Sequence, residues 1–344
     1  MKPQYICVEK VHHSDHKEYH DIHDPKKHDS SKRKALRAAF FTKKLWPPNS
    51  TIKVKFMEKN PQVMRTPEGR MDTNNGPIDP LQQYFFDNPD INLTDAVKKI
   101  VKERIEPLTN LKFVFVENSE DSDMRISFDP DRGAWSLVGT DCKKEDKNEA
   151  TMNLGWFDVA TVIHEFGHVL GMIHEHQNPR GKTISWDDKA VFKWANETQG
   201  WDEETTKKNI LDKYDKNSIN GSTFDPLSIM LYFFPGDLTT NNEGTHQNLR
   251  LSGLDVEYIG KNYKANTENI GNIYSSIYND SKLDKNIKKS QALASNLDND
   301  SGETTKSSKK KESSNWYFIV GLILLLIFVV ITGILIKKSF RKYK

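Results

Sequence analysis

The chain has 344 residues, with 50 Lys and Arg against 48 Asp and Glu, so its formal net charge is only +2. A charge this close to zero provides no general basic field for a polyanion, and we expect no nucleic-acid partner. Two cysteines allow at most one disulfide, which excludes a small secreted fold held by several disulfides. The 17 Phe, 11 Tyr and 7 Trp suffice for one good core despite a mean hydropathy of −0.72.

The N-terminal segment, residues 1–35, is polar and holds six of the 11 histidines. Their spacing matches no metal-ligand template, so a solvated low-complexity tail is favoured and an auxiliary metal site is the alternative. The first apolar cluster, Ala38–Phe41, is too short for the core of a signal peptide. We therefore expect no cleavable export signal.

Residues 36–263 carry the pattern of one folded domain. Alternating apolar residues predict strands over Thr51–Phe56, Leu111–Val116 and Met124–Phe128. Apolar residues at helical spacing predict a helix over Asp95–Ile105, with Thr94 as its candidate cap. This order of elements indicates an α+β fold in which a helix backs a sheet.

The segment Asp158–His176 carries the clearest chemistry. Its apolar residues recur at steps of three and four, which predicts a helix capped by Asp158. His164 and His168 then point the same way, because four residues turn an α-helix by about 400°. Glu165 lies about 60° round from His168. One side of this helix therefore presents two ligands and an adjacent carboxylate.

Beyond this helix, Gly171 can take the left-handed conformation that ends a helix and lets the chain bring His174 to the same point. Three neutral imidazoles, His164, His168 and His174, leave one tetrahedral position open, which is a common catalytic zinc arrangement. Calcium or magnesium would demand oxygen ligands. We expect one Zn²⁺ here, with Glu165 as general base and acid for its bound water. Scattered histidines on a surface helix are the alternative.

These residues match the pattern H-E-x-x-H-x-x-G-x-x-H, and the chain resembles the metzincin zinc endopeptidases. The stretch FDPLSIMLY, which contains Met230 and Tyr232, looks like the methionine turn of this clan in its astacin form. Glu175 and Tyr232 favour an astacin-like protein, with a matrixin-like one as second choice. The resemblance implies that Met230 lies beneath the metal and that Tyr232 steadies the oxyanion.

The resemblance spans residues 36–263 and implies a mixed twisted sheet with a backing helix, an active-site helix and a smaller irregular C-terminal subdomain. Ser252 and Asp255 suit a capping pair at the start of the closing helix. Leu231 departs from the family, which usually has histidine there, and the family's disulfides cannot form. The implied substrate is an extended protein or peptide that adds to a sheet edge, for which Trp135–Val138 is the candidate.

Metzincins are often kept latent by a prosegment residue at the open position of the metal. Cys7, or a nearby His or Asp, is a candidate for that role here. No latency motif of the family is legible in residues 1–35. An inhibitory prosegment is therefore one hypothesis for this segment, beside the solvated tail.

The C-terminal part predicts a flexible tether over residues 264–315, a transmembrane helix over 316–336 and a basic tail over 337–344. Residues 316–336 contain no charge, and about 20 apolar residues cross a bilayer as a helix. A buried core helix is the alternative. Lysines lie on both sides of the span, so the positive-inside rule barely assigns its orientation. Without an export signal, we expect a single-pass, tail-anchored protein whose domain faces the cytosol.

The function predicted from these patterns is a membrane-anchored, zinc-dependent endopeptidase. A catalytically inactive, membrane-anchored binding protein with a metzincin-shaped domain is the alternative, although Glu165 argues against it. A metal-buffering protein built on the histidine-rich tail is a third hypothesis, and it predicts several weak metal sites per chain.

Overall fold

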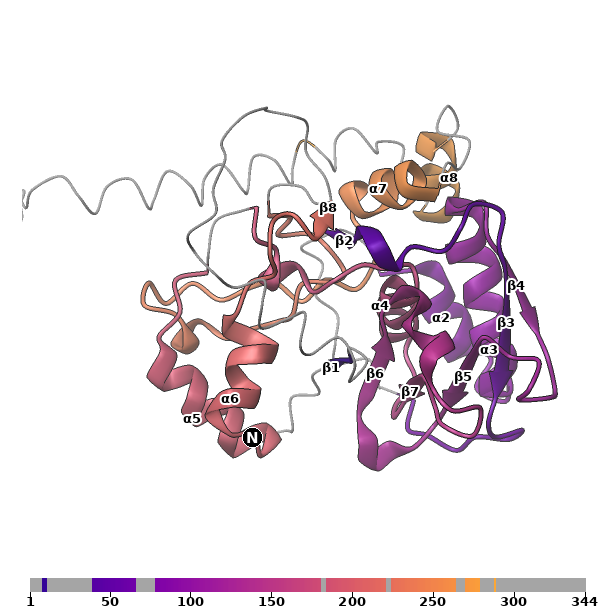
Figure 1. Ribbon diagram of the computed structural model, residues 1–344, viewed down its shortest axis with the longest axis horizontal. Coiled ribbons are helices and arrows are strands. Elements are labelled where there is room, and N and C mark those ends of the chain that lie inside the picture. Colours follow the sequence, from indigo (N-terminus) through magenta and orange to yellow (C-terminus); the bar gives the residue numbers. More distant parts are fainter. Residues whose placement is uncertain are drawn as a thin grey trace, which may run out of the picture. The chain divides into compact units, whose positions relative to one another are not determined.

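A computed structural model describes residues 8–10, 39–65, 78–180, 184–220, 224–263, 270–278 and 288 (Figure 1). Cys7, the six N-terminal histidines, the expected span 316–336 and the basic tail 337–344 lie outside these residues. Among the residues described, no helix combines the length and the apolar character needed to cross a bilayer.

A six-stranded sheet organises the first part of the chain. In spatial order its strands are Val8–Lys10 (β1), Ala134–Leu137 (β6), Met152–Leu154 (β7), Met124–Ser127 (β5), Thr51–Phe56 (β3) and Lys112–Phe115 (β4). Neighbouring strands are parallel except β6 and β7, which are antiparallel. The three strands predicted from alternating residues correspond to β3, β4 and β5. A mixed sheet, as expected, is therefore present.

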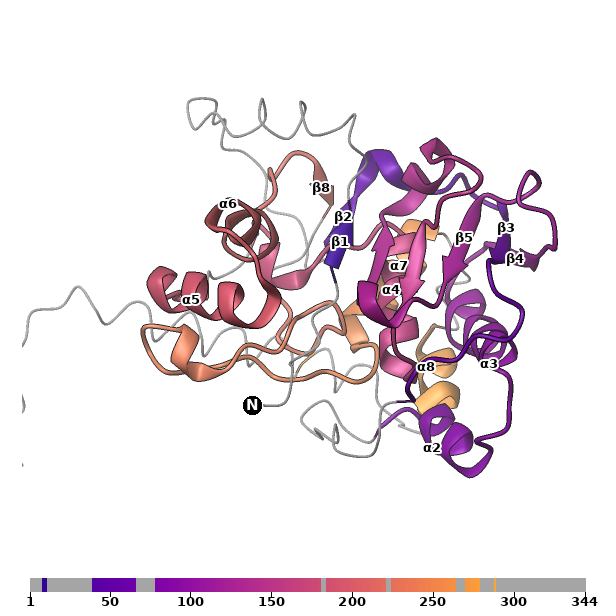
Figure 2. The same ribbon diagram turned by 90° about the horizontal axis from the view of Figure 1, so that it is seen from below.

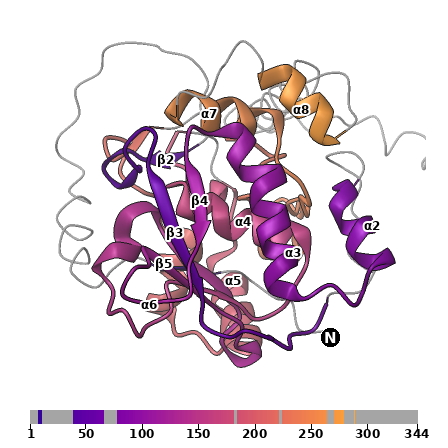
Figure 3. The same cartoon turned by 90° about the vertical axis from the view of Figure 1, so that its right-hand side faces the viewer.

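Helices pack against this sheet and form a second group further along the chain. The α-helices are Pro80–Asp87 (α2), Leu93–Ile100 (α3), Val159–Val169 (α4), Asp188–Gln199 (α5), Glu203–Thr206 (α6), Gly253–Tyr263 (α7) and Ile270–Tyr278 (α8). Two π-helical turns, Val101–Ile105 (η4) and Lys207–Leu211 (η9), continue α3 and α6. Helices α3 and α4 contact each other within the main hydrophobic core (Figure 3).

The predicted helix over Asp95–Ile105 corresponds to α3 with its π-helical continuation, but its cap differs. The side chain of Asn92 accepts a hydrogen bond from the backbone N–H of Thr94 at 2.9 Å. The expectation that Thr94 is the cap is therefore wrong by two residues. An asparagine side chain just before the first turn reaches the amide two residues on, and this satisfies a backbone donor that the helix leaves unpaired.

Helices α5 and α6 lie side by side in a smaller cluster (Figures 1 and 2). The buried residues of this second core are Val191, Ala195, Ile210, Tyr232, Phe234 and Leu238. Two short strands, Phe40–Phe41 (β2) and Ile219–Asn220 (β8), pair antiparallel in a separate small sheet. The residues of the second core show that Tyr232 packs together with residues of α5 and η9.

The folded body extends beyond residue 263, where a flexible tether was expected to begin. Helix α8 contacts α7 (Figures 1 and 3) and buries Tyr274, Ile277 and Tyr278 in the main core. The Tyr278 hydroxyl accepts a hydrogen bond from the backbone N–H of Leu251 at 3.1 Å. Polar residues dominate this stretch and predict a tether, but its apolar residues recur three and four apart and form one buried helix face.

Candidate metal centre

Helix α4 begins where the sequence predicted. The Asp158 carboxylate accepts hydrogen bonds from the backbone N–H and the hydroxyl of Thr161 at 2.6 and 2.9 Å. Every residue of α4 except Ala160 is buried. The turn that follows contains Gly171, whose φ of 89° lies in the left-handed region that favours glycine. This conformation turns the chain back and leads it to His174.

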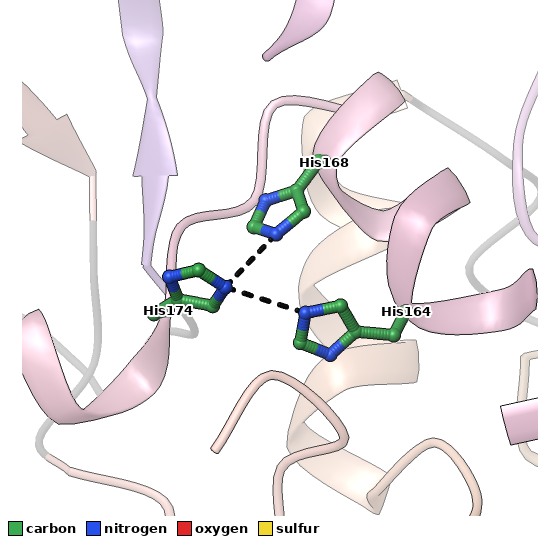
Figure 4. A group of neighbouring side chains, drawn as sticks. All are labelled: His164, His168 and His174. Atoms are coloured by element: carbon green, nitrogen blue, oxygen red, sulfur yellow. Dashed lines mark hydrogen bonds between the residues drawn. The ribbon is translucent and has the colours of Figure 1, made fainter. Parts of the chain in front are cut away.

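The three predicted ligands meet at one point (Figure 4). The Nε2 atom of His174 lies 3.3 Å from Nε2 of His164 and 3.1 Å from Nε2 of His168. Among the residues described, these histidines form the one group whose ligand atoms are placed to hold a metal ion. All three side chains are buried. The structure therefore brings the two helical histidines and the one beyond the turn together.

Hydrogen bonds set the protonation of two of these rings. Nδ1–H of His164 donates to the carbonyl of Ile229 at 2.9 Å, and Nδ1–H of His168 donates to the carbonyl of Met172 at 2.8 Å. Each Nε2 then carries a lone pair. Burial lowers the pKa of His164 to about 4. It also lowers the pKa of His168 and His174 well below the usual value. The rings are therefore neutral at pH 7.

The buried Nε2 lone pairs of His164 and His168 converge on Nε2 of His174, and such a donor set suits a cation. Nitrogen ligands about 2.0–2.1 Å from a tetrahedral zinc ion are about 3.3 Å apart. The Nε2 separations of 3.3 and 3.1 Å match this edge length. Nitrogen donors and this small cage favour zinc over calcium, which needs more numerous oxygen ligands at longer distances. The donor set fits one zinc ion.

Met230 lies directly against the active-site helix. A Cβ added to Gly167 of α4 would come within 2.6 Å of the Met230 sulfur. The Met230 backbone is fixed on both sides, because its N–H donates to Ser228 Oγ and its carbonyl accepts from the N–H of Glu175. Met230 is fully buried. The turn thus packs beneath the helix that carries His164 and His168.

The two residues expected to act in catalysis are Glu165 and Tyr232. Glu165 follows His164 on α4 and is fully buried. The ring of Tyr232 is centred 4.2 Å from the ring of His174 and 6.1 Å from that of His164. Tyr232 is buried as well. The turn after Met230 therefore brings the Tyr232 ring to the histidine cluster, and Glu165 directly follows one of the ligands in α4.

A buried carboxylate network connects the turn to the third histidine. Glu175 accepts hydrogen bonds from the Asp225 N–H and the Asn178 side chain, each at 2.8 Å. Asp255 accepts hydrogen bonds from Ser228 Oγ at 2.8 Å and from the Ile229 N–H at 3.0 Å. The sequence pattern used Glu175 as a family marker and missed this anchoring role. The only signal for this role in the sequence is that an acidic residue directly follows a predicted metal ligand.

Asp255 also completes the predicted cap of α7. The Ser252 N–H donates to Asp255 at 2.9 Å, and the Asp255 N–H donates to Ser252 Oγ at 2.9 Å. Burial, followed by the nearby Asp225 carboxylate, raises the pKa of Asp255 to about 7. The same two causes raise the pKa of Glu175 well above its usual value. The network therefore holds protons at pH values where exposed carboxyls have lost them.

The candidate substrate edge, Trp135–Val138, corresponds to β6. On one side β6 pairs with β7, and on the other it pairs in parallel with β1 (Figure 1). Val8 lies opposite Trp135 and Lys10 opposite Leu137. Part of the N-terminal segment therefore covers the edge at which a peptide was expected to add.

The chain is similar to known zinc peptidases over its folded part. The family model Astacin, which describes a peptidase family, matches residues 82–264, more than half of the chain. The zinc metalloproteinase nas-4 of Caenorhabditis elegans is 30% identical over 167 residues, which are 45% of this chain and 48% of that protein. This chain thus spans about half the length of that curated relative.

Among solved structures, that of myroilysin is similar with a TM-score of 0.50 and 30% identity, covering 65% of this chain and 98% of that chain. The family match agrees with the astacin-like resemblance and not with the matrixin-like second choice. The match contains the histidine cluster, Met230 and Tyr232. The chain belongs to the astacin family of peptidases.

Proposed function

We propose that the protein is a zinc-dependent endopeptidase that hydrolyses peptide bonds. The observation that carries this proposal is the convergence of three buried, neutral imidazoles in a member of the astacin peptidase family, with Glu165 directly after the first of them in α4. His164, His168 and His174 would hold the ion. A zinc ion bound there would act as a Lewis acid, which polarises a carbonyl and lowers the pKa of a bound water toward about 7.

The chain's own side chains perform the proton transfers and the charge stabilisation. Glu165 takes a proton from the attacking water and returns it to the leaving amine. Tyr232, whose ring packs against His174, donates a hydrogen bond to the oxygen that gains negative charge. Because both groups are buried, these interactions act in a medium of low dielectric constant and are stronger than in water.

The proposed substrate is an extended peptide that pairs with β6. Main-chain pairing accepts many side chains, so it supports a broad preference. Residues Val8–Lys10 already pair with β6. A substrate can use this edge only after β1 leaves. The pairing supports the hypothesis that residues 1–35 act as an inhibitory prosegment, while Cys7 lies outside the described residues.

The central test is the isosteric variant Glu165→Gln. It keeps the three histidines, so we expect one zinc per chain as in the unaltered protein, together with loss of cleavage of a denatured protein. Glu243→Gln, at an exposed position, is the matched control and should cleave normally. Equal cleavage by the Glu165 variant and the unaltered protein would refute the proposal. Absence of cleavage in both, with zinc bound, would favour the inactive binding protein.

We also propose that residues 316–336 anchor the protein in a bilayer with the peptidase domain facing the cytosol. The support is the uncharged apolar run in the sequence. The proposal predicts that protease added outside sealed microsomes degrades the domain. Protection of the domain until detergent is added would place it on the opposite side.

A further inference from the structure

His176 is a buried residue that the proposed chemistry does not use. It lies two positions after the third ligand, in the short turn Glu175–Gln177 (η8), and only 1% of its surface is exposed. Its ring stacks on Tyr232 with centroids 4.8 Å apart and an interplanar angle of 29°. The ring of His174 lies 5.4 Å from that of His176 at 20°. Tyr232, His174 and His176 therefore pack as a mutual triplet.

The ring of His176 is itself fixed from two further directions. Its Nε2–H donates to the carbonyl of Asn209 at 3.0 Å, in the π-helical turn η9. The rings of Phe234 and His176 meet edge to face, with centroids 5.1 Å apart and an interplanar angle of 76°. The neighbouring Gln177 donates to two carbonyls at the same turn, those of Lys208 at 2.7 Å and Asp212 at 3.1 Å. These contacts fix the plane of the His176 imidazole. Its hydrogen-bond acceptor is a backbone carbonyl, whose position does not depend on a side-chain rotamer.

Placement of the Tyr232 hydroxyl depends on the plane of its ring. A hydrogen bond to a developing oxyanion requires a donor within a few tenths of an ångström of its position. The Tyr232 ring contacts the rings of His174 and His176. His174 is a predicted metal ligand, so it would move only together with the metal site. We propose that His176 is a positioning residue that fixes the Tyr232 ring, and this inference rests on the proposed endopeptidase function.

The kinetic test uses His176→Leu, Tyr232→Phe and the double variant of the full-length, zinc-loaded protein, with a fluorogenic peptide that the unaltered protein cleaves. His176→Leu fills the buried site with an apolar side chain but removes the aromatic ring and its N–H donor. We expect kcat to fall about fivefold, the effect of one aromatic pair, with KM within about twofold. His176→Phe, which restores an aromatic face, should lose less.

Coupling separates positioning from a general structural role. If His176 acts through Tyr232, the double variant should be no slower than Tyr232→Phe alone. The proposal is overturned if the losses of kcat in the two single variants multiply in the double variant. It is also overturned if His176→Leu leaves kcat unchanged, or if His176→Phe loses as much kcat as His176→Leu.

A second readout does not depend on activity. The protein is labelled with 3-fluorotyrosine, and the signal of Tyr232 is identified by its absence in Tyr232→Phe. His176→Leu should shift and broaden this ¹⁹F signal while the other tyrosine signals and the zinc content stay unchanged. Val191→Ala, which removes two methyl groups from the same second core, is the control for lost stability and should leave the signal in place.

An unmoved Tyr232 signal in folded His176→Leu, or the same shift in Val191→Ala, would refute the positioning role. If the unaltered protein cleaves no peptide, the endopeptidase proposal fails. The fluorine spectra still decide in that case whether His176 holds Tyr232, so the two failures are distinguishable.

Discussion

The contact between Gly167 and Met230 decides how the metal-site helix responds to one added methyl group. Gly167 lies in α4 between the first two ligands. The variant Gly167→Ala would place a Cβ 2.6 Å from Met230 Sδ and 3.4 Å from Met230 Cε and Met172 Sδ. Since carbon and sulfur normally approach to about 3.5–4.0 Å, the Met230 sulfur must move by about 1 Å. Met230 is fully buried, so that movement displaces other core atoms.

Two effects of this substitution oppose each other. Alanine favours an α-helix over glycine by about 1 kcal/mol. Overpacking a close-packed core costs about 1–3 kcal/mol. The backbone of Met230 is held by hydrogen bonds at its N–H and its carbonyl, so only the side chain can adjust. Subtracting the helical gain from the cost of overpacking leaves a net cost, and we expect Gly167→Ala to lower the free energy of unfolding by up to about 2 kcal/mol.

Urea denaturation of the zinc-free protein measures this change, because metal binding then adds nothing to stability. Repeating the substitution in a Met230→Ala background removes the clash. In that background Gly167→Ala should raise the free energy of unfolding by up to about 1 kcal/mol. The reasoning is refuted if Gly167→Ala, in the protein that keeps Met230, raises the free energy of unfolding by about 1 kcal/mol.

Three further predictions concern buried charge, pH and the N-terminal segment. Arg104 binds the buried Asp79 carboxylate at 2.7 and 2.9 Å, so Arg104→Met should cost about 3–5 kcal/mol in urea denaturation, and a loss below about 1 kcal/mol would contradict this. Because the folded-state pKa of Asp255 is raised to about 7, its contribution to stability declines as pH rises from about 4 to 7. Asp255→Asn should flatten that decline relative to unaltered protein, and parallel stability curves would count against it. After deletion of residues 1–35, metal analysis should still find one tightly bound zinc per chain, and the rate of peptide cleavage should rise. Loss of most of the bound metal would instead favour the metal-buffering hypothesis.

The sequence by itself determined the local geometry of the metal site. Helical periodicity over Asp158–Val169 fixes the relative direction of His164 and His168, because the rotation per residue of an α-helix is constant. Glycine at 171 marks the reversal, since its observed φ of 89° is costly for other residues. Alternation likewise located β3, β4 and β5. Each of these features depends on residues near one another in the chain.

Tertiary structure alone decided which distant groups meet. The stacking of His176 on Tyr232 and the pairing of β1 with β6 join residues far apart in the chain. The polar composition of residues 1–35 and 264–315 hid β1 and α8, because a short strand or one apolar helix face contributes little to an average. Such contacts follow from shape and hydrogen-bond complementarity, which a one-dimensional pattern does not contain.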